Sequence, residues 1–250
     1  MTSPLFSIVT ITRNNKDGFI RTRESLERQS FHDFEWIVID GDSTDSTKDI
    51  LPPNALSESD KGIYDAMNKG IERSKGRYIL FLNAGDMLSD MDILSTLSKS
   101  VAAENPDFIY GDALETGGFY KKARDHSEID WGMFTHHQAM LYRRDIIGVL
   151  RYDISYKIAG DYAFTRIFLN LCRNISYVPA AICIFETGGI SQRNMRHGRI
   201  EQYKARQKAG CTVLKNFYIY GGQTVTAAIK RLTPDLYSGL RSKIVERRRP

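Results

Sequence analysis

The feature that most constrains the fold is a short apolar run that ends in an acid, at residues 78–86. Residues 78–82 (YILFL) are apolar without a break, which is typical of a strand buried on both faces of a parallel sheet. They are followed directly by residues 83–86 (NAGD). Three similar runs, at residues 6–11, 36–39 and 108–110, are also followed by segments that contain Asn or Asp.

Helical segments separate these runs, near residues 18–30, 65–74 and 91–103. This alternation of strand and helix predicts right-handed crossovers and parallel strands. We therefore expect an α/β fold with a mainly parallel, Rossmann-like sheet and helices on both faces. Further along the chain, we expect strands at residues 139–142, 175–178 and 181–185, and a helix from Gly160 to about residue 171.

The polar strand ends indicate where a ligand binds, because ligands of open parallel sheets lie at the carboxyl ends of the strands. Asp and Asn there favour a polar ligand held partly through a cation, since hard cations take oxygen ligands. The chain contains neither G-x-G-x-x-G nor G-x-x-x-x-G-K, which disfavours a dinucleotide-dependent dehydrogenase and a P-loop NTPase. The pattern suits a diphosphate bridged by Mg²⁺ or Mn²⁺.

Charge divides the chain into two parts. Residues 1–192 carry a net charge of −6, whereas residues 193–250 carry +11, with 14 Lys and Arg against 3 Asp and Glu. We expect a catalytic domain at residues 1–190 and a basic, largely helical extension at residues 191–250. The extension contains interleaved apolar residues, namely Phe217, Tyr218, Tyr220, Leu232, Leu236, Tyr237, Leu240 and Ile244.

An anionic membrane surface is the partner we favour for this extension, with a solvated tail, an acidic partner and ordinary packing on the catalytic domain as alternatives. On the membrane hypothesis, truncation after about residue 212 releases the protein from anionic liposomes. A nucleic-acid-binding module is a competing hypothesis, but the acidic first part offers no continuous basic face, so we expect no nucleic acid partner.

The sequence contains no apolar stretch of membrane-spanning length and no signal-peptide pattern, so we expect a cytoplasmic protein, peripheral on the inner membrane face. Cys172, Cys183 and Cys211 are odd in number and lack paired spacing, so we expect reduced thiols.

Seven sequence blocks follow one another along the chain: residues 7–14 (SIVTITRN), 35–45 (EWIVIDGDSTD), 60–70 (DKGIYDAMNKG), 76–86 (GRYILFLNAGD), 137–139 (HQA), 160–162 (GDY) and 188–191 (GGIS). In order and spacing, these blocks resemble those of family 2 glycosyltransferases with the GT-A fold. The last three resemble blocks of a subgroup that builds bacterial exopolysaccharide, O-antigen and colanic acid. The resemblance covers roughly residues 5–192.

The resemblance implies an inverting transfer from a nucleoside diphosphate sugar, with a UDP-sugar favoured, to a hydroxyl of a lipid-linked oligosaccharide. The metal-binding DxD of the family corresponds to residues 83–86, where Asn83 replaces the first acid and Asp86 is the expected Mn²⁺ or Mg²⁺ ligand. Asp161 matches the catalytic base. The structural alternatives are that Asp86 caps a helix near Asp90 and that Asp161 caps its own helix.

Residues expected to bind the nucleotide sugar are Thr12, Arg13, Asn14, Asp40, Asp42, Lys61, Asn68, Asn83 and Ala84. Gly41 stands where a second Asp is usual in the family, so Asp42 is expected to take over the base contact. Met67 replaces a frequent Arg, which removes the basis for base stacking by a guanidinium. On the residues alone, Asp40, Asp42 and Asp45 would more often be turn and N-cap residues, with Ser43 and Thr44 starting a helix.

For the sugar or the acceptor we expect His137, Gln138 and Asp112. Side chains that neighbour each other in an extended segment point to opposite faces, so of His136 and His137 we expect only His137 at the site. His197 is either a further metal ligand or a surface histidine. The loss of one acid from the DxD keeps a second function open, a catalytically silent nucleotide-sugar-binding protein.

Overall fold

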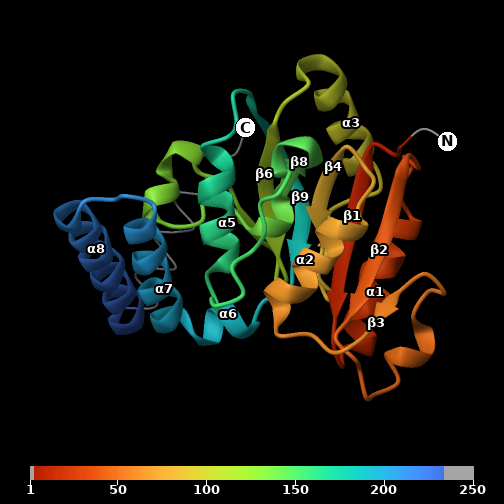
Figure 1. Ribbon diagram of the computed structural model, residues 1–250, viewed down its shortest axis with the longest axis horizontal. Helices are drawn as coiled ribbons and strands as arrows, with labels where there is room; N and C mark the ends of the chain where they lie inside the picture. The colour runs from red at the N-terminus through yellow and green to blue at the C-terminus, as the bar shows by residue number, and fades with distance from the viewer. Residues whose placement is uncertain (1–2, 234–250) are drawn as a thin grey trace.

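The computed structural model describes residues 3–233. Within them, a nine-stranded sheet is flanked by helices, and two long helices stand at one end of the molecule (Figure 1). The strands are β1 (Phe6–Thr12), β2 (Phe34–Asp40), β3 (Leu56–Ser57), β4 (Tyr78–Phe81), β5 (Met87–Leu88), β6 (Phe108–Glu115), β7 (Phe119–Lys121), β8 (Met140–Arg143) and β9 (Ile175–Phe185). The α-helices are α1 (Lys16–Glu27), α2 (Ile63–Arg73), α3 (Ile93–Glu104), α4 (Arg144–Ile147), α5 (Gly160–Leu169), α6 (Ile190–Arg193), α7 (Met195–Lys208) and α8 (Val213–Leu232), and three 3₁₀ turns are η1 (Lys48–Ile50), η2 (His126–Trp131) and η3 (His137–Ala139).

The strand order is β3-β2-β1-β4-β8-β6-β9-β5, with β7 paired to β6. The strands β1, β2, β4 and β6, predicted from the four apolar runs, all point in one direction, as expected. The strand β8 lies between β4 and β6 and runs antiparallel to both, which makes the sheet mixed. The α/β fold with helices on both faces is confirmed.

Alternate residues of the strands pack on opposite faces. Val9 of β1 belongs to a core that includes Met67 of α2 and Phe164 of α5. Ile8 belongs to a second core that includes Leu26 of α1 and Leu97 of α3. The apolar runs are continuous because both faces of these strands are covered.

The strands expected at residues 175–178 and 181–185 form one long strand, β9. Its register against β6 shifts next to Asp112, opposite the segment that contains Pro179. Proline has no N–H to donate, so within a sheet it is tolerated at such irregular positions. The proline therefore interrupts the sequence pattern without ending the strand.

The basic part of the chain begins with two packed helices. The helix α7 lies beside α5, and α8 packs on α7 (Figure 1). Ala205 of α7 belongs to the core that α5 helps to form, and Ile219 of α8 is buried. The domain boundary near residue 190 stays a prediction. Leu236, Tyr237, Leu240 and Ile244 lie outside the described residues.

None of the helices within residues 3–233 combines the length and the apolarity that a membrane crossing requires. All three cysteines are free thiols, and Cys183 is fully buried.

Candidate active site

A cavity of about 760 Å³ opens at the carboxyl edge of the sheet. Its walls come from segments far apart in the sequence: the end of β1, the start of α2, the loop after β4, the segment before β8, the start of α5, the end of β9, and α7. Eight of the predicted site residues line it, namely Thr12, Arg13, Asn83, Ala84, Asp86, His137, Gln138 and Asp161. The predicted ligand edge and this cavity therefore coincide.

Asp86 is a buried carboxyl group in the cavity wall, with only 4% of its surface exposed. Its Oδ2 accepts a hydrogen bond from Gln138 Nε2 at 2.6 Å, and its Oδ1 accepts one from the Glu186 N–H at 2.9 Å. Burial raises the pKa of Asp86 to about 6, and these hydrogen bonds oppose the rise. Asp86 does not cap the following helix, because Asp92 is the N-cap residue of α3.

Gly85, next to Asp86, has a positive φ of 107°, which glycine adopts most readily. A Cβ at this position would collide with the Glu186 carboxylate. The glycine thus lets the loop after β4 and the end of β9 approach each other.

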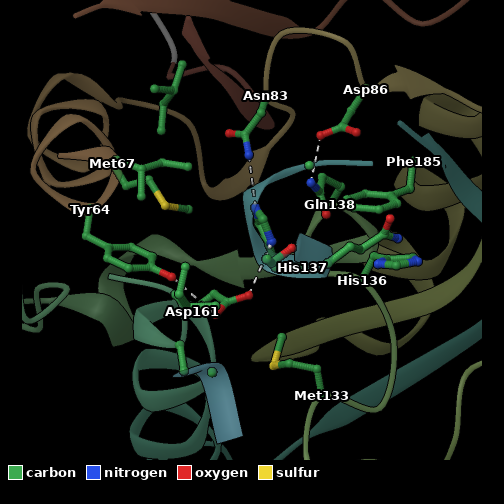
Figure 2. A pocket seen from close by; sticks show the side chains of 18 of the residues that line it. Tyr64, Met67, Asn83, Asp86, Met133, His136, His137, Gln138, Asp161 and Phe185 are labelled. Carbon is green, nitrogen blue, oxygen red and sulfur yellow. Dashed lines mark hydrogen bonds and ion pairs between the residues drawn. The ribbon is translucent and has the colours of Figure 1, made fainter. Parts of the chain in front are cut away.

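A line of polar side chains crosses the cavity from β4 to α5 (Figure 2). Asn83 Nδ2 lies 3.4 Å from His137 Nε2, and His137 Nδ1 lies 3.5 Å from Asp161 Oδ2. On its other side, Asp161 Oδ1 lies 3.5 Å from the Tyr64 hydroxyl. Burial first, and then the charge of Asp161, raise the pKa of Tyr64, so the hydroxyl keeps its proton.

Asp161 lies in the first turn of α5 and is not its N-cap residue, which is Ala159. Its Oδ1 accepts a hydrogen bond from the Tyr162 N–H at 2.8 Å. The side-chain contacts to His137 and Tyr64 are longer, so the carboxylate is oriented loosely by its neighbours and faces the cavity.

His136 and His137 both line the cavity, so the expectation that His137 alone reaches the site is wrong. His137 begins the turn η3, and the extended alternation does not continue through it. The His136 ring stacks on Phe185 with a centroid distance of 4.0 Å, and its Nε2 lies 3.2 Å from Glu115 Oε1. Burial lowers the pKa of His136 to about 4.

Six predicted residues lie outside the cavity lining. In three of them, the polar groups form hydrogen bonds that hold other parts of the chain. Asp40 is fully buried and accepts from the N–H and hydroxyl of Ser43 and from the Ser57 hydroxyl. Asn68 forms two hydrogen bonds with the backbone of Tyr152. Direct contacts of Asp40 and Asn68 with a donor stay predictions.

Asp112 is the third of these residues. Its carboxylate accepts from the hydroxyl groups of Tyr120 and Tyr177 and from the Ala123 N–H, so it ties β7 and β9 to β6. Its predicted contact with sugar or acceptor stays untested.

Asn14, Asp42 and Lys61 are exposed and do not line the cavity. Asn14 Oδ1 accepts from the Thr44 N–H at 2.8 Å, which joins the loops after β1 and β2. Asp42 pairs with Lys48 at 2.9 Å, and this hydrogen bond lowers the pKa of Asp42. His197 is a largely exposed histidine that contacts Glu201 and does not line the cavity.

Sequence reasoning missed several cavity residues. Glu186 had a usable signal, because it directly follows the apolar run 181–185 as Asp86 follows its own run. Arg199 and Gln202 of α7 had none, because the sequence of a charged helix does not tell which side meets a cavity.

The mixed α/β sheet and the cavity at its carboxyl edge, with an acid from the loop after β4 and another from the start of α5, define a GT-A-type glycosyltransferase. The profile of the family "Glycosyl transferase family 2" matches residues 7–169, and the chain belongs to this family.

Two relatives illustrate the similarity in sequence. A "PGL/p-HBAD biosynthesis glycosyltransferase" of Mycobacterium tuberculosis (strain H37Rv) is 32% identical over 206 residues, which are 76% of this chain and 80% of the relative. The "putative teichuronic acid biosynthesis glycosyltransferase TuaG" of Bacillus subtilis is 36% identical over 92 residues, which are 33% of this chain and 36% of the relative.

Solved structures share the fold at lower identity. S. aureus TarS 1-349 in complex with UDP-GlcNAc superposes with a TM-score of 0.68 at 19% identity, covering 80% of this chain and 64% of that chain. The mannosyltransferase PcManGT from Pyrobaculum calidifontis, in complex with GDP-Man and Mn2+, superposes with a TM-score of 0.64 at 13% identity, covering 97% of this chain and 81% of that chain.

Proposed function

We propose that this glycosyltransferase moves a sugar, with inversion, from a nucleoside diphosphate sugar to a hydroxyl of a lipid-linked oligosaccharide in bacterial surface polysaccharide synthesis. The observation that carries the proposal is the placement of Asp161 across the cavity from Asn83 and Asp86, with His137 between them. The Asp161 carboxylate thus lies on one wall of the cavity. The loop that corresponds to the diphosphate-binding loop of the family lies on the opposite wall.

In the proposed reaction, Asp161 accepts the proton of the acceptor hydroxyl as the hydroxyl oxygen attacks the anomeric carbon. The bond from that carbon to the diphosphate breaks on the opposite side, and the diphosphate leaves. His137 and Tyr64 flank the Asp161 carboxylate at 3.5 Å each, and the Tyr162 N–H donates a 2.8 Å hydrogen bond to it.

The residues around Asp86 fit a divalent cation, Mn²⁺ or Mg²⁺. Besides the carboxylate, the side-chain oxygens of Asn83 and Gln138 are buried in the structure without hydrogen-bond partners, and hard cations prefer oxygen ligands. Nowhere within the described ranges do three His, Cys, Asp or Glu side chains form a complete metal site. Mg²⁺ is commonly held by one or two carboxylates together with substrate phosphates, and the bound cation neutralises the charge of the leaving diphosphate.

The choice of donor class is supported by the ligands named with two solved structures of the same fold. TarS is named with UDP-GlcNAc and PcManGT with GDP-Man and Mn2+, which supports a nucleotide sugar, and we favour a UDP-sugar. The names of the curated relatives, which refer to PGL/p-HBAD and teichuronic acid biosynthesis, support a bacterial glycan as the product.

We place the enzyme on the cytoplasmic side of the inner membrane, peripherally bound through α8. Several apolar residues of this helix are exposed, among them Leu214, Phe217 and Leu232, and residues 213–232 contain three basic residues and no acid. An interfacial helix presents such a face to lipid while basic residues meet anionic headgroups.

The test is a thermal-shift screen of UDP-, GDP- and TDP-sugars with and without Mn²⁺, followed by transfer assays with the ligand that raises Tm. Asp161→Asn should retain donor binding and lose transfer by ~10²- to 10⁴-fold, because the amide cannot accept the proton. The matched control is Asp33→Asn, an exposed position at the amino end of β2, which should transfer like the wild type.

An Asp161→Asn variant within threefold of wild type would exclude Asp161 as the base. Affinity for a nucleotide sugar without any turnover would instead support the silent binding protein, the hypothesis that the missing acid at Asn83 keeps open. Activity unchanged by a chelator would exclude the metal role of Asp86.

A further inference from the structure

The helix α7 forms part of the cavity wall, although it begins well after residue 169, where the match to the family profile ends. Gly198, Arg199 and Gln202 of α7 line the cavity. In Figure 1, α7 stands beside α5, the helix that carries Asp161. The basic part of the chain therefore takes part in the candidate active site.

Glu201 is the residue through which α7 holds the segment that leads into α5. It is 5% exposed, and its carboxylate accepts three hydrogen bonds of 2.8 Å from consecutive N–H groups. Oε1 accepts from Lys157, and Oε2 accepts from Ile158 and Ala159.

These three residues also line the cavity, and Ala159 is the N-cap residue of α5. Hydrogen bonds to an ionised carboxylate are stronger than those between neutral groups, so Glu201 fixes the backbone two residues before Asp161. Burial alone would raise the pKa of Glu201, but the hydrogen bonds from residues 157–159 and from His197 outweigh it and lower that pKa, which keeps the carboxylate charged.

The close approach of α7 gives a second, independent contact on the same segment. A Cβ added to Gly198 would lie 3.1 Å from Ile158 Cγ2, a distance that leaves no room for a larger residue without movement. The two contacts hold α7 and residues 157–159 at a fixed separation.

The backbone is what sets the position of the Asp161 carboxylate. Its side-chain contacts to His137 and Tyr64 are both 3.5 Å, too long to orient it strongly, whereas the segment before it is held by three bonds of 2.8 Å.

We propose that Glu201 is a positioning residue for the candidate base Asp161 and that α7 thereby completes the catalytic centre. This inference rests on the proposed function, in which Asp161 takes the proton of the acceptor. Because a displacement of about 1 Å can lower a rate ~10²-fold, loss of Glu201 acts on turnover. Donor binding, on the far side of the cavity, is left unchanged.

The experiment compares Glu201→Gln with wild type in a transfer assay, with each protein assayed well below its own Tm. The amide keeps the size of the side chain but presents one acceptor and one donor, so the three N–H groups cannot all be satisfied. We expect kcat to fall at least ~10-fold while the KM for the donor stays within about threefold.

Two further variants separate positioning from stability. Asp130→Asn weakens the ion pairs to Arg166 of α5 and Lys215 of α8 without touching residues 157–159, so it should lower Tm and leave kcat unchanged. Gly198→Ala keeps Glu201 and displaces the segment by a few tenths of an ångström, so it should lower kcat several-fold at unchanged donor KM. If Glu201→Gln does not fold, Gly198→Ala decides.

The inference is overturned if the folded Glu201→Gln variant keeps kcat within twofold of wild type, if its loss appears in the donor KM, or if Asp130→Asn loses as much kcat. Where Gly198→Ala has to decide, a kcat equal to wild type overturns it. Two other results would show that the proposed function itself is wrong: wild-type protein that transfers no sugar, or an Asp161→Asn variant with full transfer activity.

Discussion

Asp86 is a carboxyl group that the fold keeps away from water. Among residues 3–233, only Gln138 Nε2 and the Glu186 N–H donate to its side chain in place of water, and burial raises its pKa to about 6 despite these hydrogen bonds. A group of this kind is costly to keep charged in the folded protein, and such residues concentrate at functional sites.

Asp86→Asn should therefore stabilise the protein near neutral pH while reducing transfer. The pKa of Asp86 is about 6 in the folded state against an ordinary 3.8, so the folded state binds the proton more tightly and wild-type stability falls as pH rises from about 4 to about 6. The difference corresponds to about 3 kcal/mol at about 1.36 kcal/mol per pH unit. In the variant, the amide oxygen can accept from the Glu186 N–H. The NH₂ group then faces Gln138, whose amide has to turn over so that Oε1, which has no partner among the described residues, accepts in place of the donating Nε2.

The measurement is Tm against pH between 4 and 8. The Tm advantage of Asp86→Asn over wild type should grow between pH 4 and 6 and then level off, whereas Asp33→Asn should follow wild type throughout. Parallel curves of Tm against pH for wild type and Asp86→Asn would show that the buried charge of Asp86 does not destabilise the folded protein.

At the scale of elements, α8 has two unlike faces. Asn216 and Ile219 are buried against the rest of the protein, while Leu214 and Phe217 are 86% and 71% exposed. Asn216 Oδ1 accepts a 2.7 Å hydrogen bond from the fully buried Arg206. Truncation after residue 212 would remove this acceptor, so loss of membrane binding and loss of folding would not be separable in that experiment.

Substitution on the exposed face avoids this difficulty. The triple change Leu214→Ser, Phe217→Ser and Leu232→Ser should abolish binding to anionic liposomes at low salt, because it removes the apolar side chains that would enter the lipid. Tm and donor binding should stay within error of wild type. The control is Val149→Ser, a fully exposed apolar side chain outside α8.

Co-sedimentation with vesicles of anionic and of neutral lipid measures the effect. Equal sedimentation of the triple variant and wild type, or no binding of wild type to anionic vesicles, would refute the membrane surface as the partner of α8.

The elements that the sequence predicted well are those with a strong local pattern. Buried runs specified β1, β2, β4 and β6, because each is covered on both faces. The direction of β8 could not be read from its three apolar residues, Met140, Leu141 and Tyr142, since a run buried between two strands looks the same in either direction. The strands β5 and β7 have two and three residues, too few for any periodicity.

At the scale of the whole molecule, the structure places the predicted catalytic domain in close contact with the helices that follow it. A fragment of residues 1–190 leaves the N–H groups of residues 157–159 without Glu201 and uncovers the core that Ala205 completes. Water can replace Glu201 at these N–H groups, but the uncovered apolar side chains lose their burial, which is worth about 25 cal/mol per Å² out of the ~5–15 kcal/mol that stabilises a domain.

We therefore expect this fragment to be insoluble or to unfold at a much lower temperature than the full chain, as measured by circular dichroism on heating. A fragment with the Tm of the full chain would instead show that residues 1–190 are an autonomous domain.

The candidate site was predictable where its residues follow strands, as Asn83 and Asp86 do. It was not predictable where a side chain holds neighbouring segments of the chain, as Asp40 and Asp112 do. The same residue type can contact the nucleotide sugar or form an internal hydrogen bond. The contribution of α7 depends on packing between helices about 40 residues apart, which no local pattern encodes.

The cavity walls span the chain from Ile11 to Gln202, and this has a consequence for synthesis on the ribosome. Chains fold from the N-terminus as they emerge, so the loop after β4 that carries Asn83 and Asp86 leaves the exit tunnel long before α7 does. On our assignment of Glu201, the loop after β4 can already have emerged while the backbone before Asp161 still lacks its hydrogen bonds to Glu201. Productive turnover then begins only after α7 has emerged, and nascent chains stalled before that point would consume little nucleotide sugar.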